Sequence, residues 1–138
     1  MALEISKAEV WAAGIEDRAG GLADKVQPLS EAGGNFEFLI SRRDKPGTGV
    51  VFVTPVKGAR VVKAARAAGF AKSDSIHSLR IEGGDKAGTI ARAARALSDA
   101  GISFRGLSAA AIGRRFVAHI ALDSADDAKK AAAVLKKL

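Results

Sequence analysis

Two short turns contain the residues of this 138-residue chain that are best placed for binding chemistry. The first turn has an acid, a base and two glycines: Asp17, Arg18, Ala19, Gly20, Gly21 and Leu22. The second has a similar set: Asp85, Ala87, Gly88 and Thr89. A predicted helix follows each turn, and its first backbone N–H groups lack intrahelical partners and lie at the positive end of the helix dipole. A ligand carboxylate is stabilised at such a position, and glycine lets it approach closely.

Both turns recur in a repeat that spans most of the chain. Residues 17–39 align with residues 85–107 at a step of 68 positions, and ten of the 23 pairs are identical. When a shift of two residues is allowed, the strand before each turn and the strand and alanine-rich helix at the end of each copy also correspond. We therefore expect two copies of one structural unit.

Each copy has the pattern of a strand, a helix, two strands and a second helix. Short β-type runs end at turn signals. Apolar residues at the i, i+4, i+7 spacing, such as Leu22, Val26 and Leu29, predict a helix with one buried face, and Gly33 and Gly101 are expected to follow the helix ends. One more strand per copy completes the ferredoxin-like βαββαβ order. The predicted fold class is α+β, with two tandem antiparallel sheets and the helices on one face of each.

The fourth strand of each copy has to be found in the remaining sequence. The first copy can take it from residues 70–75, which follow its second helix. The second copy ends in a helix at Leu138, and residues 2–7 are the remaining β-like stretch. We expect an N-terminal strand swap, with unit boundaries at 8–75 and 76–138 and residues 1–7 supplying the last strand of the second unit.

The arrangement of these motifs resembles the amino-acid-binding ACT domain. An acid, a base, a small residue and glycine stand between strand and helix, the helix ends in Ala-Gly, and Asn35 precedes an apolar strand. The resemblance covers nearly the whole chain twice, so the chain is similar to a stand-alone tandem ACT protein with no attached catalytic domain. It departs from the family in having Ala19 and Ala87, where a proline commonly precedes the turn glycine.

The resemblance implies a regulatory module that binds a free amino acid at the turn and at the junction between units. It implies that the module modulates a metabolic enzyme or regulator, without catalysis and without a cofactor, as a homodimer or larger assembly. The positions of Asp17 and Asn35 contact the ligand in the family, and both side chains can accept hydrogen bonds from an ammonium group. We expect Asn35 beside the turn. The second copy has Asp85, but Ser103 stands in place of Asn35.

Purely structural roles fit several of the same residues. An Asp before a helix can cap that helix, so capping is the alternative for Asp17 and Asp85. Asn35 can shape a turn. His77 is in phase with apolar strand residues and is expected to pack, and His119 has no metal-ligand partner at short spacing.

Nucleic-acid binding is the main alternative function. The net charge is +7, which attracts phosphates, and the ferredoxin-like sheet is also an RNA-recognition scaffold. That scaffold stacks bases on exposed strand aromatics in an RNP1-type motif, which this sequence lacks. Nucleic acid is therefore the less favoured partner.

Composition narrows the remaining classes of function. The chain has no Cys and two His, so thiolate and zinc chemistry are disfavoured. Acylphosphatase shares the fold class, but its substrate-binding Arg and Asn motif is not recognisable here. No run of residues is long and apolar enough for a membrane span, and the N-terminal sequence has Glu4 where a secretion signal needs apolar residues. We expect a non-enzymatic, cytoplasmic protein.

Overall fold

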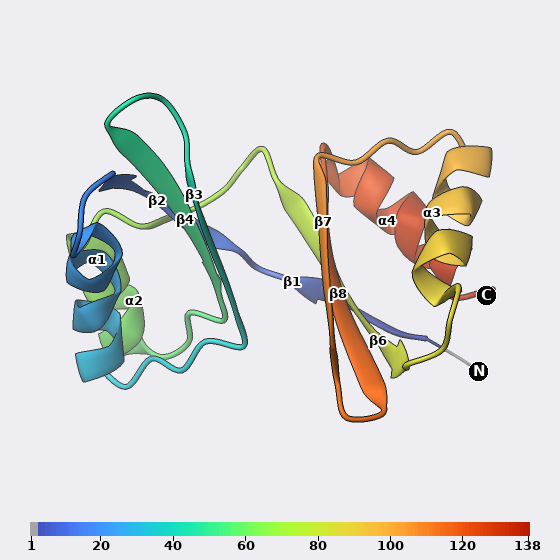
Figure 1. Ribbon diagram of the computed structural model, residues 1–138, viewed down its shortest axis with the longest axis horizontal. Helices are drawn as coiled ribbons and strands as arrows, with labels where there is room; N and C mark the ends of the chain where they lie inside the picture. The colour runs from blue at the N-terminus through green and yellow to red at the C-terminus, as the bar shows by residue number, and fades with distance from the viewer. Residues whose placement is uncertain (1–2) are drawn as a thin grey trace. The chain divides into compact units, whose positions relative to one another are not determined.

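The computed structural model describes residues 3–138 and divides the chain into two compact units. Residues 9–73 form the N-terminal unit, and residues 74–138 together with the segment up to residue 8 form the C-terminal unit. Each unit is a four-stranded antiparallel sheet with two helices on one face (Figure 1). This is the predicted α+β, ferredoxin-like fold.

The N-terminal unit contains, in chain order, β2 (Trp11–Glu16), α1 (Gly21–Glu31), β3 (Phe38–Arg43), β4 (Thr48–Thr54), α2 (Ala59–Ala67) and β5 (Ala71–Lys72). Its strand order is β3-β4-β2-β5. The last strand is shorter than the predicted 70–75. Phe70 turns into the core, where it is 3% exposed, and its N–H donates to the Ala65 carbonyl. Of the residues that follow it, Ala71 and Lys72 pair with β2.

The C-terminal unit contains β6 (His77–Gly84), α3 (Thr89–Asp99), β7 (Gly106–Ile112), β8 (Arg115–Leu122), α4 (Ala125–Leu135) and β1 (Glu4–Ala8). Its strand order is β1-β6-β8-β7. β1 pairs antiparallel with β6, from Glu4 opposite Glu82 to Ala8 opposite Ser78. The N-terminal strand therefore fills the fourth place in this sheet, as predicted. It begins and ends later than the expected 2–7, and Ala2 lies outside the described residues.

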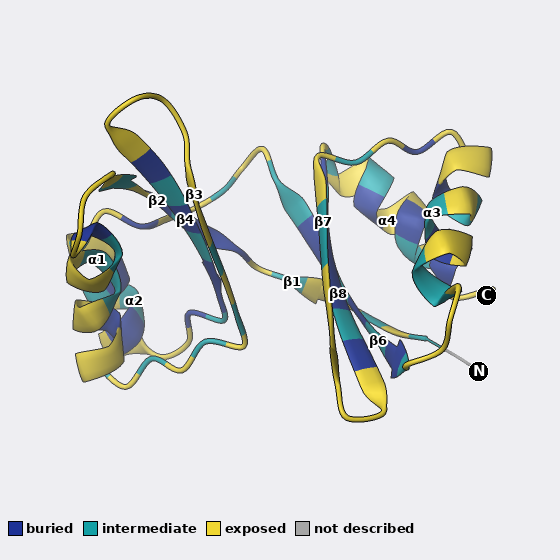
Figure 2. Cartoon of the chain, in the orientation of Figure 1, coloured by how far each residue is buried: buried dark blue, intermediate teal, exposed yellow. Residues whose placement is uncertain are grey.

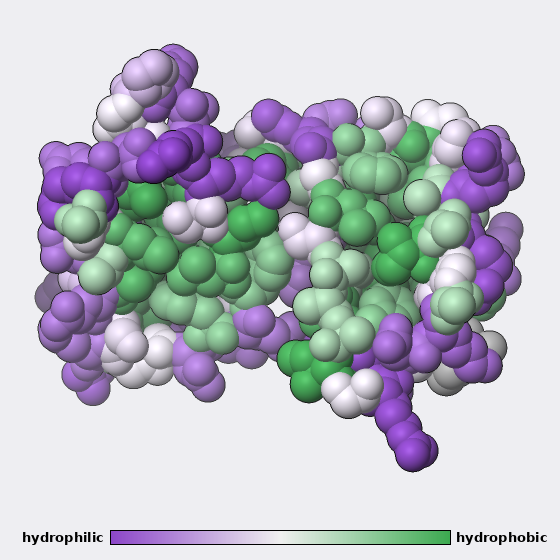
Figure 3. Space-filling view, viewed as in Figure 1, coloured by the Kyte–Doolittle hydropathy of each residue, from purple (hydrophilic) through white to green (hydrophobic). Residues whose placement is uncertain are grey.

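The core of each unit lies between its sheet and its helices, where apolar residues gather while polar residues cover the outer helix surfaces (Figures 2 and 3). Leu29 in α1 and Leu97 in α3 occupy the same position of the repeat, and both are fully buried. Gly33 and Gly101 follow the ends of these helices with φ of +100° and +73°, a left-handed conformation that ends a helix at little cost in glycine. Helix periodicity and the glycine stops therefore predicted these helices correctly.

Among residues 3–138, no helix has the length and hydropathy needed to cross a membrane.

Candidate ligand-binding turns

The turn between β2 and α1 depends on two glycines with different constraints. Gly20 precedes the helix with φ of +86°, in the left-handed region. Gly21 is constrained by space, because a Cβ atom there would lie 2.2 Å from the backbone oxygen of Glu16. Its N–H donates to the Arg18 carbonyl at 3.0 Å, which closes the turn tightly.

The helix N-termini carry backbone N–H groups that are available to a ligand. Within the described residues, the first helical bond of α1 is donated by Asp24 to Gly20, so the N–H groups of Leu22 and Ala23 have no backbone acceptor. The N-cap positions are Gly20 and Gly88, and no described side chain caps either helix. The capping alternative for Asp17 and Asp85 is therefore wrong.

The β3–β4 hairpin holds Asp17 in place. The Asp17 N–H donates to the Gly47 carbonyl at 3.1 Å, at the tip of the hairpin. The Asp17 carboxylate pairs with Arg43 Nε at 3.0 Å. Its side chain is 33% exposed while that of Arg43 is 84% exposed, so this ion pair is open to water and to a competing cation.

The turn between β6 and α3 repeats this arrangement in the C-terminal unit. Gly88 precedes α3 with φ of +84°. The Asp85 N–H donates to the Arg114 carbonyl at 2.8 Å, in the turn of the β7–β8 hairpin. Asp85 and Asp17 are thus anchored through the backbone by equivalent hairpins. The Asp85 side chain makes no ion pair within the described residues.

Comparison with known proteins identifies the family of this second unit. The family model described as the ACT domain matches residues 77–138. The C-terminal unit belongs to the ACT domain family. No curated protein matches the sequence.

Several solved structures can be aligned with almost the whole of this chain. A protein of Bacteroides thetaiotaomicron has a TM-score of 0.80 at 19% identity, over 96% of this chain and 89% of that one. The regulatory subunit of aspartate kinase from Thermus thermophilus has a TM-score of 0.67 at 18% identity, over 99% and 96%. A putative C-terminal regulatory domain of aspartate kinase from Porphyromonas gingivalis has a TM-score of 0.57 at 15% identity, over 99% and 94%. Both units of the present chain therefore have the ACT-type fold.

A pocket of about 320 Å³ adjoins the turn of the N-terminal unit, and its lining is electrostatically balanced. Eight residues line it: Ile15, Glu16, Arg18, Gly21, Asp24, Lys25, Pro28 and Ala68. Arg18 pairs with both Glu16 and Asp24, and the hydrogen bonds to these carboxylates raise its pKa further above the ordinary value. Lys25 donates to the Ala68 carbonyl at 2.9 Å. The cations here are already engaged.

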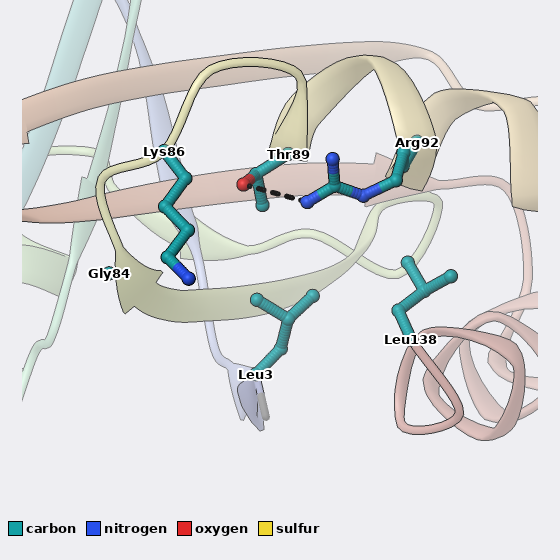
Figure 4. A pocket seen from close by; sticks show the side chains of 6 residues that line it. All are labelled: Leu3, Gly84, Lys86, Thr89, Arg92 and Leu138. Carbon is teal, nitrogen blue, oxygen red and sulfur yellow. Dashed lines mark hydrogen bonds between the residues drawn. The ribbon is translucent and has the colours of Figure 1, made fainter. Parts of the chain in front are cut away.

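The turn of the ACT domain adjoins a smaller pocket of about 190 Å³. Its lining is Leu3, Gly84, Lys86, Thr89, Arg92 and Leu138 (Figure 4). Thr89 Oγ1 accepts a hydrogen bond from Arg92 at 3.3 Å. No described residue that lines this pocket is acidic.

Asn35 does not lie beside the turn of its own unit, so that expectation is wrong. The strand β4 pairs with both β2 and β3 and therefore gives a common scale along the sheet. Asp17 follows Glu16, which pairs with Thr48 at the start of β4. Asn35 precedes Phe38, which pairs with Thr54 at the end of β4. Six residues of β4 separate these levels, about 20 Å at about 3.4 Å per residue. Asp17 and Asn35 are at opposite ends of the sheet.

Ser103 has the corresponding place in the ACT domain. It is exposed and precedes β7, whose first residue is opposite Ala121, while Asp85 follows Gly84, which is opposite Arg115. Asn35 is likewise exposed in the loop after α1. Neither residue can share a ligand with the turn of its own unit.

Sequence reasoning missed the contribution of the hairpins and of the basic pocket. The hydrogen bond from the Asp17 N–H to the Gly47 carbonyl depends on the register between β2 and β4. Lys86 was in the predicted turn without an assigned role, and Arg92 lies one helical turn beyond Gly88. Within residues 3–138, no three His, Asp or Glu side chains are grouped as metal ligands.

Proposed function

We propose that this chain is a regulatory module that binds a free amino acid at its strand–turn–helix junctions and modulates a metabolic enzyme or regulator, with no reaction of its own. The ligand carboxylate binds the unpartnered N–H groups at the start of α1 or α3. Its ammonium group binds the acid of the turn, Asp17 or Asp85. The remaining residues of each turn, from Arg18 to Leu22 and from Ala87 to Thr89, shape the backbone around the ligand.

The observation behind this proposal is the recurrence of one arrangement in both units. A helix with free N–H groups begins at a left-handed glycine, and an acid beside it is anchored to a hairpin tip. Such a helix start stabilises a carboxylate, and a carboxylate side chain next to it stabilises an ammonium group. A zwitterionic amino acid presents both groups on one carbon atom.

Asn35 can contact a ligand at a strand–turn–helix junction only if that junction belongs to another unit. Since Asn35 and Asp17 are at opposite ends of one sheet, we propose that Asn35 of a second copy of the chain completes the site at Asp17. This proposal requires a homodimer or larger assembly. The edge strands β3 and β7 offer six and seven residues for such an association.

The relatives support a regulatory role in a separate chain. The ACT family model matches the C-terminal unit, and the aspartate kinase structure from Thermus thermophilus is that of a regulatory subunit. We propose by analogy that the present chain acts on a partner enzyme or regulator and does not catalyse a reaction.

A thermal-shift screen of the twenty amino acids tests the function. A ligand that binds only the folded state adds about 2.7 kcal/mol at 100 times its dissociation constant. For the ligand found, Asp17→Ala and Asn35→Ala should each weaken binding by about 5- to 150-fold, since a hydrogen bond to a charged group contributes about 1 to 3 kcal/mol. Glu31→Ala, at the other end of α1, is the control. Unchanged affinity in both site variants would refute the assignment of the first turn.

Arg43 gives an independent test of the first turn. Because Arg43 already occupies the Asp17 carboxylate, a ligand ammonium group has to displace it. Arg43→Ala should therefore tighten binding severalfold in calorimetry, and Asp17→Ala should remove that gain.

Sedimentation tests the assembly. We expect a homodimer or larger species at micromolar concentration. A monomer that still binds the amino acid in an Asn35-dependent way would contradict a site completed by a second copy.

A further inference from the structure

The basic pocket of the ACT domain differs in charge from the pocket at the first turn. Lys86 reaches into it from the turn, and Arg92 reaches into it from the first turn of α3 (Figure 4). Neither side chain makes an ion pair with another residue of the described chain. Among the described residues, the Arg92 side chain donates a hydrogen bond only to the Thr89 hydroxyl, a neutral group, so both cations can be offered to a ligand.

The first pocket has the opposite property. Its two cations are satisfied internally, Arg18 by Glu16 and Asp24 and Lys25 by a backbone carbonyl. The side chains that line the first pocket therefore sum to zero formal charge, while the side chains that line the basic pocket sum to +2 from Lys86 and Arg92. The two turns do not suit the same ligand.

We propose that the basic pocket selects a ligand with a second negative group, namely an acidic amino acid or a comparable dicarboxylate. This inference rests on the proposed function, because the first carboxylate is assigned to the start of α3. The second carboxylate then binds between Lys86 and Arg92, where guanidinium offers paired donors and ammonium a point charge.

The other lining residues fit such a ligand. Leu3 and Leu138 form an apolar wall opposite the two cations, suited to the methylene groups between two carboxylates (Figure 4). Asp85, the acid of this turn, does not line the pocket, so it does not repel the second carboxylate from within. It stays beside the helix start for the ammonium group.

Matched ligand pairs test this selectivity by calorimetry on the full chain. L-Glutamate against L-glutamine, and L-aspartate against L-asparagine, differ in one charge at nearly equal size. We expect the acid of at least one pair to bind about tenfold more tightly, as charge-assisted hydrogen bonds predict at an exposed site. The preference should shrink as salt is raised from 50 to 500 mM, because added salt screens exposed charges.

Substitutions then locate the preference. Lys86→Gln and Arg92→Gln should each weaken binding of the acid about five- to tenfold and leave the amide partner unchanged. Arg95→Gln is the matched control, because it removes the same charge from an exposed position of α3 outside the pocket. An equal loss in Arg95→Gln would overturn the proposed contacts.

Glutarate, a dicarboxylate without an ammonium group, separates the two proposals. If glutamine and asparagine bind as tightly as glutamate and aspartate, selection of a second carboxylate is refuted, while the proposed binding of an amino acid stands. If no amino acid binds but glutarate binds in a Lys86- and Arg92-dependent way, amino-acid binding fails at this turn and selection of a dicarboxylate stands. If neither acidic amino acids nor glutarate bind, the basic pocket is not the proposed site.

Discussion

Gly21 and Thr89 occupy the same position of the repeat, yet only Gly21 is required to be glycine. The Glu16 carbonyl lies so close that a Cβ at residue 21 would be 2.2 Å from its oxygen. The second turn also has four residues between strand and helix, residues 85–88, and Thr89 follows them as the first residue of α3. The first turn therefore keeps its shape through backbone contacts that no side chain could replace.

Gly21→Ala should destabilise the N-terminal unit by about 2 kcal/mol or more, because the backbone must shift to relieve the overlap. Urea unfolding followed by circular dichroism would measure this loss. Gly106→Ala is the control, since a Cβ there meets no atom within 4 Å. Equal stability of the two variants would contradict the close approach at the first turn.

Glu82 makes part of the stability dependent on pH. Hydrogen bonds from Arg80 at 2.7 Å and Arg115 at 2.8 Å hold its pKa below the ordinary range of a glutamate. A carboxyl group whose pKa is lower in the folded state than in the unfolded state stabilises the protein. This stabilisation is fully present when the pH is above the pKa of the unfolded state, about 4.3, and it is lost as the pH falls through the pKa of the folded state. The C-terminal unit should therefore lose stability in this acidic window.

Glu82→Gln should reduce the dependence of unfolding free energy on pH below about 4.3, because glutamine cannot titrate. Urea unfolding at a series of pH values from 7 to 3 measures the slope. Glu31→Gln is the comparison, because among the described residues the Glu31 carboxylate accepts a hydrogen bond only from the neutral Gln27 side chain. Parallel pH curves for wild type and Glu82→Gln would exclude this role.

Among the helices, α4 begins at a side-chain cap. The Ser124 side chain accepts a hydrogen bond from the Asp127 N–H at 3.0 Å. α1 and α3 instead begin at glycines, which leave their first N–H groups open. The helices next to the candidate ligand turns therefore have no side-chain cap, and neither has α2, which begins after Gly58, whereas α4 is capped by Ser124.

Ser124→Ala should cost about 1 kcal/mol, the usual contribution of an N-cap side chain. Ser124→Asp should retain most of the stability, because its carboxylate accepts the same bond and favours the helix N-terminus. Thermal unfolding of both variants measures the difference. A loss in Ser124→Asp as large as in Ser124→Ala would show that the cap is not responsible.

At the scale of the whole molecule, the first strand belongs to the last unit. Five residues of β1 pair with β6, and Leu3 and Ile5 pack against the core of the C-terminal unit. Without β1, the strand β6 becomes an exposed edge and part of the apolar core faces water. The folding of the C-terminal unit therefore depends on both ends of the chain.

Deletion of residues 1–8 should speed amide exchange in β6 and β8, while exchange in β2 and β4 changes little. Hydrogen exchange measured by mass spectrometry separates the two units within one sample. Ile5→Ala is a milder variant that keeps the backbone pairing and should produce a smaller change in the same peptides. Unchanged exchange in β6 after the deletion would contradict the contribution of β1.

Much of the fold could be predicted because it depends on order and periodicity along the chain. The repeat predicted two units, the apolar spacing that includes Leu29 predicted a buried helix face, and the glycine signals marked the helix ends. The missing strand of the second copy followed by counting, since the βαββαβ order needs four strands. Each of these features depends on the order and spacing of residues along the chain, so the sequence alone was sufficient to predict it.

The candidate site depended on tertiary structure, because strand register and the direction of side chains decide it. Asp17 and Asn35 are 18 residues apart in sequence, but the helix between them runs the length of the sheet and places them at opposite ends. Arg43 meets Asp17, and Lys86 and Arg92 share a pocket with Leu3, only because distant segments are brought together in space. Spacing along the chain determined the elements, and pairing across the sheets decided which side chains could meet a ligand.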